Sequence, residues 1–257
     1  MGLFEKKYCD ICGEKIGLLG NRKLEDGNLC KDCAKKLSPW FDERRHSTLE
    51  QIKAQLAYRE ENRKNVEAFH TTRSFGHRYP VCLDEDNQKF LVARTGNLLS
   101  ENPDVLDYSQ VTGCDLDVRE SRTEVKRKGS DGQEVSYNPP RYRYQYDFDM
   151  VIRVNHPYFD DMRFQLNDSS VEVGVQPLHA GLSGNAGVVG HTNPDYQEYE
   201  QMGKEIKEAL MNARQEVRDH IAAAAAPKTA VICPCCGATT VPDASGRCEY
   251  CGGAVNG

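Results

Sequence analysis

The sequence lacks any long apolar run, and no segment approaches the roughly 20 apolar residues that span a bilayer as a helix. The first eight residues carry charges where a secretory signal would be apolar. Position 6 is Lys, whereas a myristoylation signal has Ser or Thr there. These absences argue against an exported or membrane-anchored protein, and we expect a cytoplasmic one.

An excess of positive charge is also missing. The formal net charge is −6 with neutral thiols, and eight zinc-bound thiolates with two Zn²⁺ would lower it by about four more. A general nucleic-acid binder is more often basic. The composition therefore argues against nucleic acid as a partner.

Signatures of catalysis are absent as well. Residues 174–190 contain Gly181, Gly184 and Gly187 but no lysine and no Gly-Lys-Ser/Thr, so we interpret them as a surface loop rather than a phosphate loop. No cofactor fingerprint or close pair of lone carboxylates stands out. A catalytic triad is recognised by geometry, which a sequence leaves open. We expect a protein without enzymatic activity.

The sequence is rich in cysteine, and eight of its 11 cysteines form Cys-x2-Cys pairs. This pattern favours metal over disulfides in a chain without an export signal. The first set is Cys9, Cys12, Cys30 and Cys33. It supplies four thiolates for tetrahedral zinc at about 2.3 Å per bond. We expect a treble-clef-like finger with a hairpin within residues 18–29, a helix beginning after Cys33, and Trp40 packed against the finger.

The second set stands near the other end, at Cys233, Cys236, Cys248 and Cys251, with the spacing of a short zinc ribbon. Four cysteines leave no open coordination position, so both sites are expected to be structural and to bind two zinc ions per chain; iron is the alternative. Cys235 lies inside the first pair of this set. Three roles are open for Cys235: a ligand that exchanges with one of its neighbours, an oxidisable thiol, or an inert exposed thiol.

A long helix is expected from residue 47 to about residue 70. Ser47 and Glu50 have capping-box spacing. An apolar stripe then follows, made of Leu49, Ile52, Leu56, Val66 and Phe69. The middle of the segment, residues 59–64, is all polar, and we interpret it as a solvated stretch between the finger and a sheet.

Residues 142–154 alternate apolar and polar side chains with period two, which predicts a long antiparallel strand with one buried face. Further strands are expected at 79–83, 89–93, 111–119, 123–127 and 162–166, with a turn at residues 138–140. Asn193 and Pro194 predict a last helix to about residue 220. A small antiparallel sheet closed by a C-terminal helix resembles a pleckstrin-homology-like architecture. The resemblance does not settle function.

The resulting fold class is α+β, with five parts along the chain. They are a zinc module (1–46), a connecting helix (47–77), an antiparallel β domain with its closing helix (78–222), an Ala/Pro linker (223–230) and a zinc ribbon (231–257). The few large apolar residues of the ribbon indicate that it folds independently of the β domain. Cys82 and Cys114 fall in strands and are expected to be buried free thiols.

A basic hairpin tip lies within the β domain, at Arg122, Lys126, Arg127 and Lys128. Such a hairpin in pleckstrin-like domains can meet anionic lipid headgroups, so membrane contact is a weak candidate. Asp131 and Glu134 follow at once and dilute the field. We therefore interpret the tip as a solvated hairpin.

A family resemblance rests on residues 8–13, residues 27–33 and the run Ser38-Pro39-Trp40-Phe41 with residues 44–48. These segments resemble the N-terminal zinc-ribbon module of bacterial proteins catalogued as a domain of unknown function, family 4428. The resemblance implies metal binding and no known activity. The C-terminal ribbon is a generic pattern found in many bacterial proteins.

These observations predict a non-enzymatic zinc-binding adaptor whose modules present surfaces to protein partners. The alternative is nucleic-acid binding through the zinc ribbons. Neither ribbon has the excess of Lys and Arg that this alternative requires. A redox or enzymatic role of Cys235 ranks last.

Overall fold

The computed structural model describes residues 6–94, 96–177, 190–225, 230–243 and 245–255. The chain divides into two compact units, Met1–Gln215 and Glu216–Gly257. The boundary falls inside the last long helix. Most of the predicted loop at 174–190 and part of the predicted linker at 223–230 lie outside the described residues. The division into five parts stays a prediction.

The first unit begins with a small cysteine-rich finger. Strands β1 (Arg22–Lys23) and β2 (Asn28–Leu29) form the expected antiparallel hairpin, and α1 (Lys31–Ala34) follows at once. A compact core holds the finger together, and it includes one residue of the next helix. Its buried members are Cys9, Ile16, Leu24, Leu29, Cys33, Leu37 and Ile52.

The predicted long helix is α2 (Leu49–Ala68), preceded by the short turn η1 (Glu43–His46). Its N-cap is Thr48 rather than Ser47. The capping box pairs Thr48 with Gln51, one residue later than expected. Ile52 packs into the finger core, whereas Val66 packs near the other end against the first sheet. The helix therefore joins the finger to the sheet, as its two apolar ends predicted.

The β region contains two four-stranded sheets, where one sheet was expected. The first consists of β3 (Arg73–Phe75), β4 (Val81–Asp84), β5 (Lys89–Val92) and β6 (Leu106–Asp107), in that order and antiparallel. The helix α3 (Leu98–Glu101) lies between β5 and β6 in the chain, and η2 (Tyr108–Gln110) follows β6. Strands β4 and β5 match the predicted ones. The short edge strands β3 and β6 were missed.

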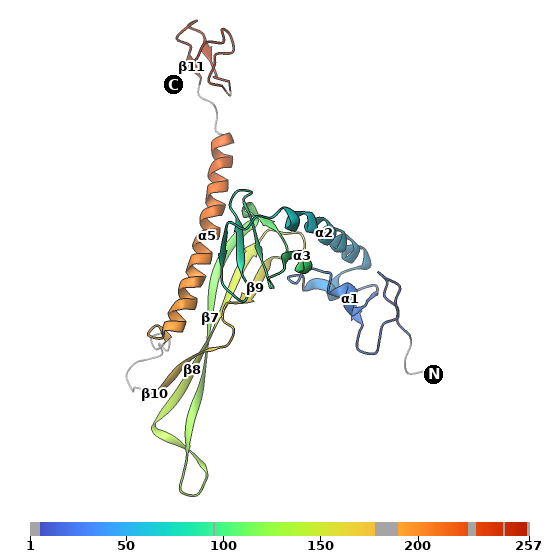
Figure 1. The fold of residues 1–257 in the computed structure, drawn as a ribbon, viewed down its shortest axis with the longest axis vertical. Helices are drawn as coiled ribbons and strands as arrows, with labels where there is room; N and C mark the ends of the chain where they lie inside the picture. Colours follow the sequence, from blue (N-terminus) through green and yellow to red (C-terminus); the bar gives the residue numbers. More distant parts are fainter. Residues whose placement is uncertain (1–5, 95, 178–189, 226–229, 244, 256–257) are drawn as a thin grey trace. The chain divides into compact units, whose positions relative to one another are not determined.

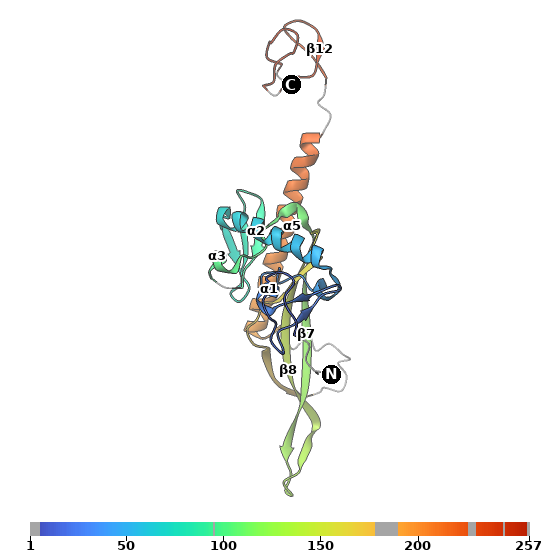
Figure 2. The same cartoon turned by 90° about the vertical axis from the view of Figure 1, so that its right-hand side faces the viewer.

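The second sheet is built on β7 (Val111–Lys128) and β8 (Glu134–Val154), which Figure 1 and Figure 2 show as one long twisted pair. Strands β9 (Asp161–Gln165) and β10 (Val171–Pro177) both pair with β8. Strand β10 was not predicted, and its residues 174–177 belong to the segment that was expected to be a surface loop. The two strands predicted at 111–119 and 123–127 are therefore one. The turn predicted at residues 138–140 is wrong, because these residues lie within β8. The register shifts opposite them, between Val125 and Lys126, which accommodates two prolines that lack a donor.

The alternation that predicted β8 is confirmed for residues 144–148, whereas residues 148–152 are buried on both faces, Asp149 and Val151 included. Tyr144, Tyr146, Phe148, Met150 and Ile152 are all buried. The helix α5 (Pro194–Ala225) packs against this face. The ring of its Tyr196 lies 4.9 Å from that of Phe148, and Gly203 lets the helix approach Leu116. The alanine run extends α5 five residues beyond the predicted end at residue 220.

Two expectations about single side chains can be compared directly. Cys82 and Cys114 are buried free thiols, as predicted. Trp40 was expected to pack on the finger, but its ring lies against Phe164 of β9, with centroids 6.2 Å apart. None of the helices among the described residues has both the length and the apolar character needed to cross a membrane.

Candidate metal centres and the adjoining pocket

The first predicted cysteine set comes together in the finger. The sulfurs of Cys9, Cys12, Cys30 and Cys33 all lie within 4.8 Å of one another, and Cys12 Sγ is 3.7 Å from Cys30 Sγ. Four sulfurs at about 2.3 Å from a tetrahedrally bound zinc would be separated by about 3.8 Å. The donor set and its spacing therefore fit one zinc ion.

Local backbone geometry brings these sulfurs together. The chain reverses after the first pair, where Gly13 adopts a positive φ of 74° and donates its N–H to the Cys9 carbonyl at 2.8 Å. The second pair caps a helix, because Cys30 is the N-cap of α1 and its sulfur accepts from the Cys33 amide at 3.3 Å. A helix is present at this pair, but it begins at Lys31 rather than after Cys33 and ends at Ala34.

The second set forms an equivalent cluster in the C-terminal unit. The sulfurs of Cys233, Cys236, Cys248 and Cys251 lie within 4.8 Å of one another. The Cys233–Cys251 and Cys236–Cys248 sulfur separations are 3.6 and 3.8 Å. Both pairs turn through a following glycine, Gly237 with φ 70° and Gly252 with φ 67°. The short strands β11 (Val231–Ile232) and β12 (Thr239–Thr240) flank the first turn.

Electrostatics within the clusters favour a bound cation. The backbone N–H of Cys236 lowers the pKa of the Cys233 thiol to about 6. Burial opposes ionisation of Cys9, but the N–H groups of Cys12 and Cys30 outweigh it and lower the pKa of Cys9 to about 6. Burial and the neighbouring thiols raise the pKa of Cys33. The positive charge of a metal ion among the four sulfurs would favour the thiolate form of the remaining cysteines and lower their pKa.

Cys235 is exposed and lies outside the set of four converging sulfurs. An ideal Cβ on Gly253 would lie 2.8 Å from the Cys235 sulfur, so this thiol rests against the turn after the second pair. The structure thus brings together all eight predicted ligands, in two groups of four. Each group can hold one ion with no open coordination position.

A buried polar network joins the finger to the first sheet, and it was missed in the sequence. Arg59 Nη1 lies 2.6 Å from Asp104 Oδ1, and their side chains are 6% and 0% exposed. Ser38 donates to the other carboxylate oxygen at 2.7 Å, and Tyr58 donates to Oδ1 at 3.2 Å. Arg59 also donates to the Asn102 carbonyl. Residues 59–64 of α2 were expected to be solvated; this is wrong for Arg59 and Asn62, which are buried, whereas residues 60, 61, 63 and 64 are exposed.

The same helix buries two further polar side chains. Asn62 is 0% exposed and donates to Asn102 Oδ1 at 2.8 Å, while it accepts the Val105 amide at 3.0 Å. Gln55 is also fully buried. Residues 102–105 supply donors and acceptors for Arg59 and Asn62. Both amide atoms of Gln55, in contrast, have no hydrogen-bond partner among the described residues.

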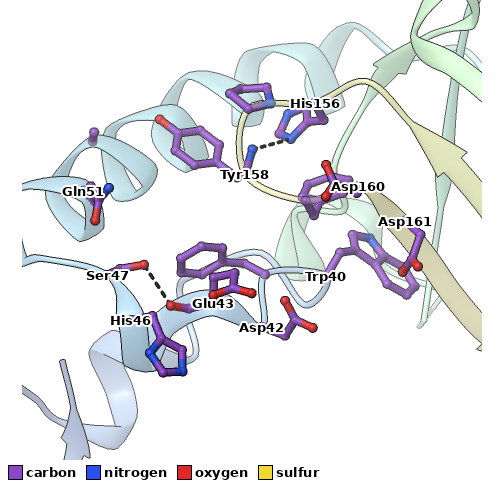
Figure 3. A pocket seen from close by; sticks show the side chains of 14 residues that line it. Trp40, Asp42, Glu43, His46, Ser47, Gln51, His156, Tyr158, Asp160 and Asp161 are labelled. Atoms are coloured by element: carbon purple, nitrogen blue, oxygen red, sulfur yellow. Dashed lines mark hydrogen bonds between the residues drawn. The ribbon is translucent and has the colours of Figure 1, made fainter. Parts of the chain in front are cut away.

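A cavity of ≈ 640 Å³ opens beside this network (Figure 3). Its lining comes from residues 40–43, 46 and 47 of the finger region, 51 and 54 of α2, 156–160 between β8 and β9, and Asp161 at the start of β9. Four exposed carboxylates belong to this lining, from Asp42, Glu43, Asp160 and Asp161. None of the four makes an ion pair within the part of the chain that the structure describes. The cavity thus combines aromatic walls with unpaired negative charge.

His156, at the edge of this cavity, predicts a pH dependence of stability. Its ring lies 4.1 Å from that of Phe159 and 5.0 Å from that of Tyr58. Burial lowers the pKa of His156 below its usual 6.5, although Asp104 acts in the opposite direction. The unfolded chain therefore binds this proton more readily, and the free energy of unfolding should fall as the pH is lowered through 6.5.

Urea unfolding between about pH 7.5 and 5.5 measures this effect, since this window brackets the ordinary histidine pKa. The wild type should lose more stability across the window than His156→Phe does. His46→Gln, which changes an exposed histidine on the same cavity, should follow the wild type. Parallel curves for the wild type and His156→Phe would contradict the prediction.

Comparison with known proteins bears on the finger alone. Residues 7–55 match a family described as a domain of unknown function (DUF4428). This segment contains all four cysteines of the first cluster and the start of α2, so the resemblance seen in the sequence is supported there. No curated protein and no solved structure matches the chain.

Proposed function

We propose that the protein is a non-enzymatic, zinc-binding adaptor that presents rigid surfaces to protein partners. In this proposal each four-cysteine cluster holds one structural zinc ion. A site filled by four thiolates has no position for a substrate or an activated water, so its contribution is to fold the chain around it. The C-terminal cluster acts in this proposal as a zinc ribbon.

The single observation that carries the proposal is the cavity between the finger region and the β8–β9 connection. Its carboxylates are exposed and make no ion pair with any residue that the structure describes, and they lie next to aromatic rings at Trp40, Phe41 and Tyr158. A partner segment with Lys or Arg beside an apolar side chain would complement both features. Zinc fixes the finger side of this cavity.

The remaining parts of the proposal concern the fold of the β region, the cellular location and contact with a membrane. A pleckstrin-homology-like arrangement of the β region would add a second scaffold for partner binding. A cytoplasmic location in a bacterium agrees with the free thiols and with the resemblance of the finger. Contact with a membrane surface is the weakest of these suggestions.

Affinity capture from a native lysate of the source organism tests the proposal. The full-length protein should recover a protein partner, and Asp160→Asn/Asp161→Asn should lose most of it. A matched control, Glu67→Gln/Glu208→Gln, removes two exposed charges elsewhere and should capture as the wild type does. Recovery of the bait alone would contradict an adaptor, and equal capture by both variants would exclude the cavity as the docking site.

A further inference from the structure

The distal end of the β7–β8 pair has a charge balance unlike the rest of the chain. We call residues 121–143 the hairpin arm. The arm holds six Arg or Lys side chains and three carboxylates, whereas the whole chain has a formal net charge of −6. A local positive excess on an acidic protein matters only if its charges gather on one surface. The strand register decides this.

Three arginines share one face of the arm. Thr123 lies opposite Arg143, and Val125 lies opposite Arg141, and directly paired residues share a face. The register shifts between Val125 and Lys126, so Arg127 is assigned to this face by a contact: its guanidinium and that of Arg141 lie over the same Tyr137 ring. We call this surface the arginine face.

The carboxylates of the arm lie elsewhere. Glu124 is opposite Tyr142, and Glu134 is opposite Lys128, which places both acids on the other face. Asp131 is in the turn, where its carboxylate accepts the Gln133 amide at 3.1 Å. The arginine face therefore carries no carboxylate from within the arm, whereas the opposite face mixes both signs.

Ion pairing of the arginines on this face changes with their distance from the base of the sheet. The arginines nearer the base each meet a carboxylate: Arg153 with Asp115 at 2.7 Å, Arg163 with Asp117 at 3.1 Å, Arg119 with Asp149 at 2.7 Å and Arg143 with Glu172 at 2.9 Å. Arg127 and Arg141 lie farthest out and are exposed. Neither makes an ion pair with any described residue. These two charges are available to a partner.

An aromatic ring holds the two unpaired arginines. The Arg141 guanidinium lies 4.6 Å from the centroid of the Tyr137 ring, and the Arg127 guanidinium lies 5.9 Å from the same centroid. Such cation–π contacts leave the guanidinium edges free to donate hydrogen bonds. A guanidinium that rests on a ring loses less conformational entropy when it binds an anion than one that has no contact.

The arm is a two-stranded β-ribbon, and this shape favours some polyanions over others as its partner. A two-stranded β-ribbon fits the major groove of B-form DNA, whereas the major groove of A-form RNA is too narrow and deep for side chains to read. The turn of the arm, residues 129–133, contains no large apolar side chain that would enter a lipid bilayer. We infer that the arginine face binds the phosphate backbone of double-stranded DNA through Arg127 and Arg141.

This inference goes beyond the adaptor role and does not depend on it. The acidic composition and the neutral ribbons argued against nucleic acid, but neither observation reports how charge is distributed over the arm. The arm also differs from the alternative of DNA binding through the zinc ribbons, because no cysteine cluster takes part.

Fluorescence anisotropy of the full-length protein with a short labelled DNA duplex tests the inference. Two phosphate contacts predict an affinity that falls about tenfold between about 50 and 200 mM salt. Arg127→Gln/Arg141→Gln should lower the affinity at least tenfold at the lower salt concentration and remove nearly all of this salt dependence. Thermal unfolding of each variant should match the wild type, since both side chains are exposed.

The control is Lys126→Gln/Lys128→Gln, which removes the same charge from the opposite face. It should change the affinity less than about threefold, because exposed charges away from the contact are screened. Equal losses in both variants would overturn the assignment to the arginine face. Absence of DNA binding at low salt, or binding only to phosphatidylserine vesicles tested in parallel, would overturn the inference itself.

Discussion

Asp104→Ala is expected to lower the free energy of unfolding of the N-terminal unit by about 3–5 kcal/mol, because it leaves Arg59 charged and uncompensated in a buried site. The Asp104 carboxylate is fully buried and accepts hydrogen bonds from Ser38, Tyr58 and Arg59. Its removal also leaves the Ser38 hydroxyl without its acceptor. Chemical denaturation monitored by far-UV circular dichroism measures the change.

The matched control is Glu61→Ala, which breaks the Lys64–Glu61 pair on the same helix. These side chains are 72% and 68% exposed, so the change should stay within about 0.5 kcal/mol. If both variants cost the same, the Arg59–Asp104 pair does not join α2 to residues 102–105. The double variant Arg59→Met/Asp104→Leu should cost less than the two single changes together, since it leaves no unpaired charge.

Cys33→Ser and Cys248→Ser are expected to have different consequences, although each should lose one zinc ion. A structural zinc site contributes roughly 10–16 kcal/mol of apparent binding free energy. Cys33 belongs to the core that includes Ile52 of α2, so its loss should destabilise the first unit. Even 3 kcal/mol corresponds to about 6–12 °C in the melting temperature of a domain of this size.

Cys248 belongs to a separate small core, whose other buried members are Cys233 and Val255. Its loss should unfold the ribbon and leave the main thermal transition within a few degrees of the wild type. Differential scanning calorimetry with metal analysis of each variant makes the comparison. Limited proteolysis of Cys248→Ser should remove the ribbon and spare the rest. A cooperative collapse of the whole protein on loss of Cys248 would contradict independent folding.

The features that the sequence predicted well are those set by local geometry. A Cys-x2-Cys-Gly knuckle closes through the positive φ of one glycine, as at Gly13 and Gly237, so its spacing is visible without tertiary information. The alternation of residues 142–154 reports one buried face of a strand in the same way. The two clusters, α2, residues 142–154 of β8 and most of α5 were therefore predictable.

The features that were missed depend on residues distant in sequence. The polar middle of α2 was predicted to be solvated because its partners, residues 102–105, lie about 40 residues away in the sequence. No local sequence pattern indicates that Asp104 contacts Arg59. The division of the β region into two sheets likewise depends on which strands pair. Short edge strands such as β3 and β6 carry too few residues for a period-two pattern to be recognised.

At the hairpin arm, the order of charges along the sequence led to a wrong expectation about the local field. Asp131 and Glu134 follow the basic residues directly in the sequence, which suggested a diluted field. The register places Glu134 opposite Lys128, away from Arg127 and Arg141. Sequence order therefore mixes charges that the fold separates, because neighbouring residues of a strand point to opposite faces.

The central claim, that two closed four-cysteine sites each hold a structural zinc ion, is tested most directly by elemental analysis of the full-length protein purified without chelators. The account predicts two zinc ions per chain and no other transition metal in stoichiometric amount. Removal of both ions by a strong chelator should abolish the folded signals of the finger and the ribbon. One zinc ion per chain, none, or iron in their place would contradict the account.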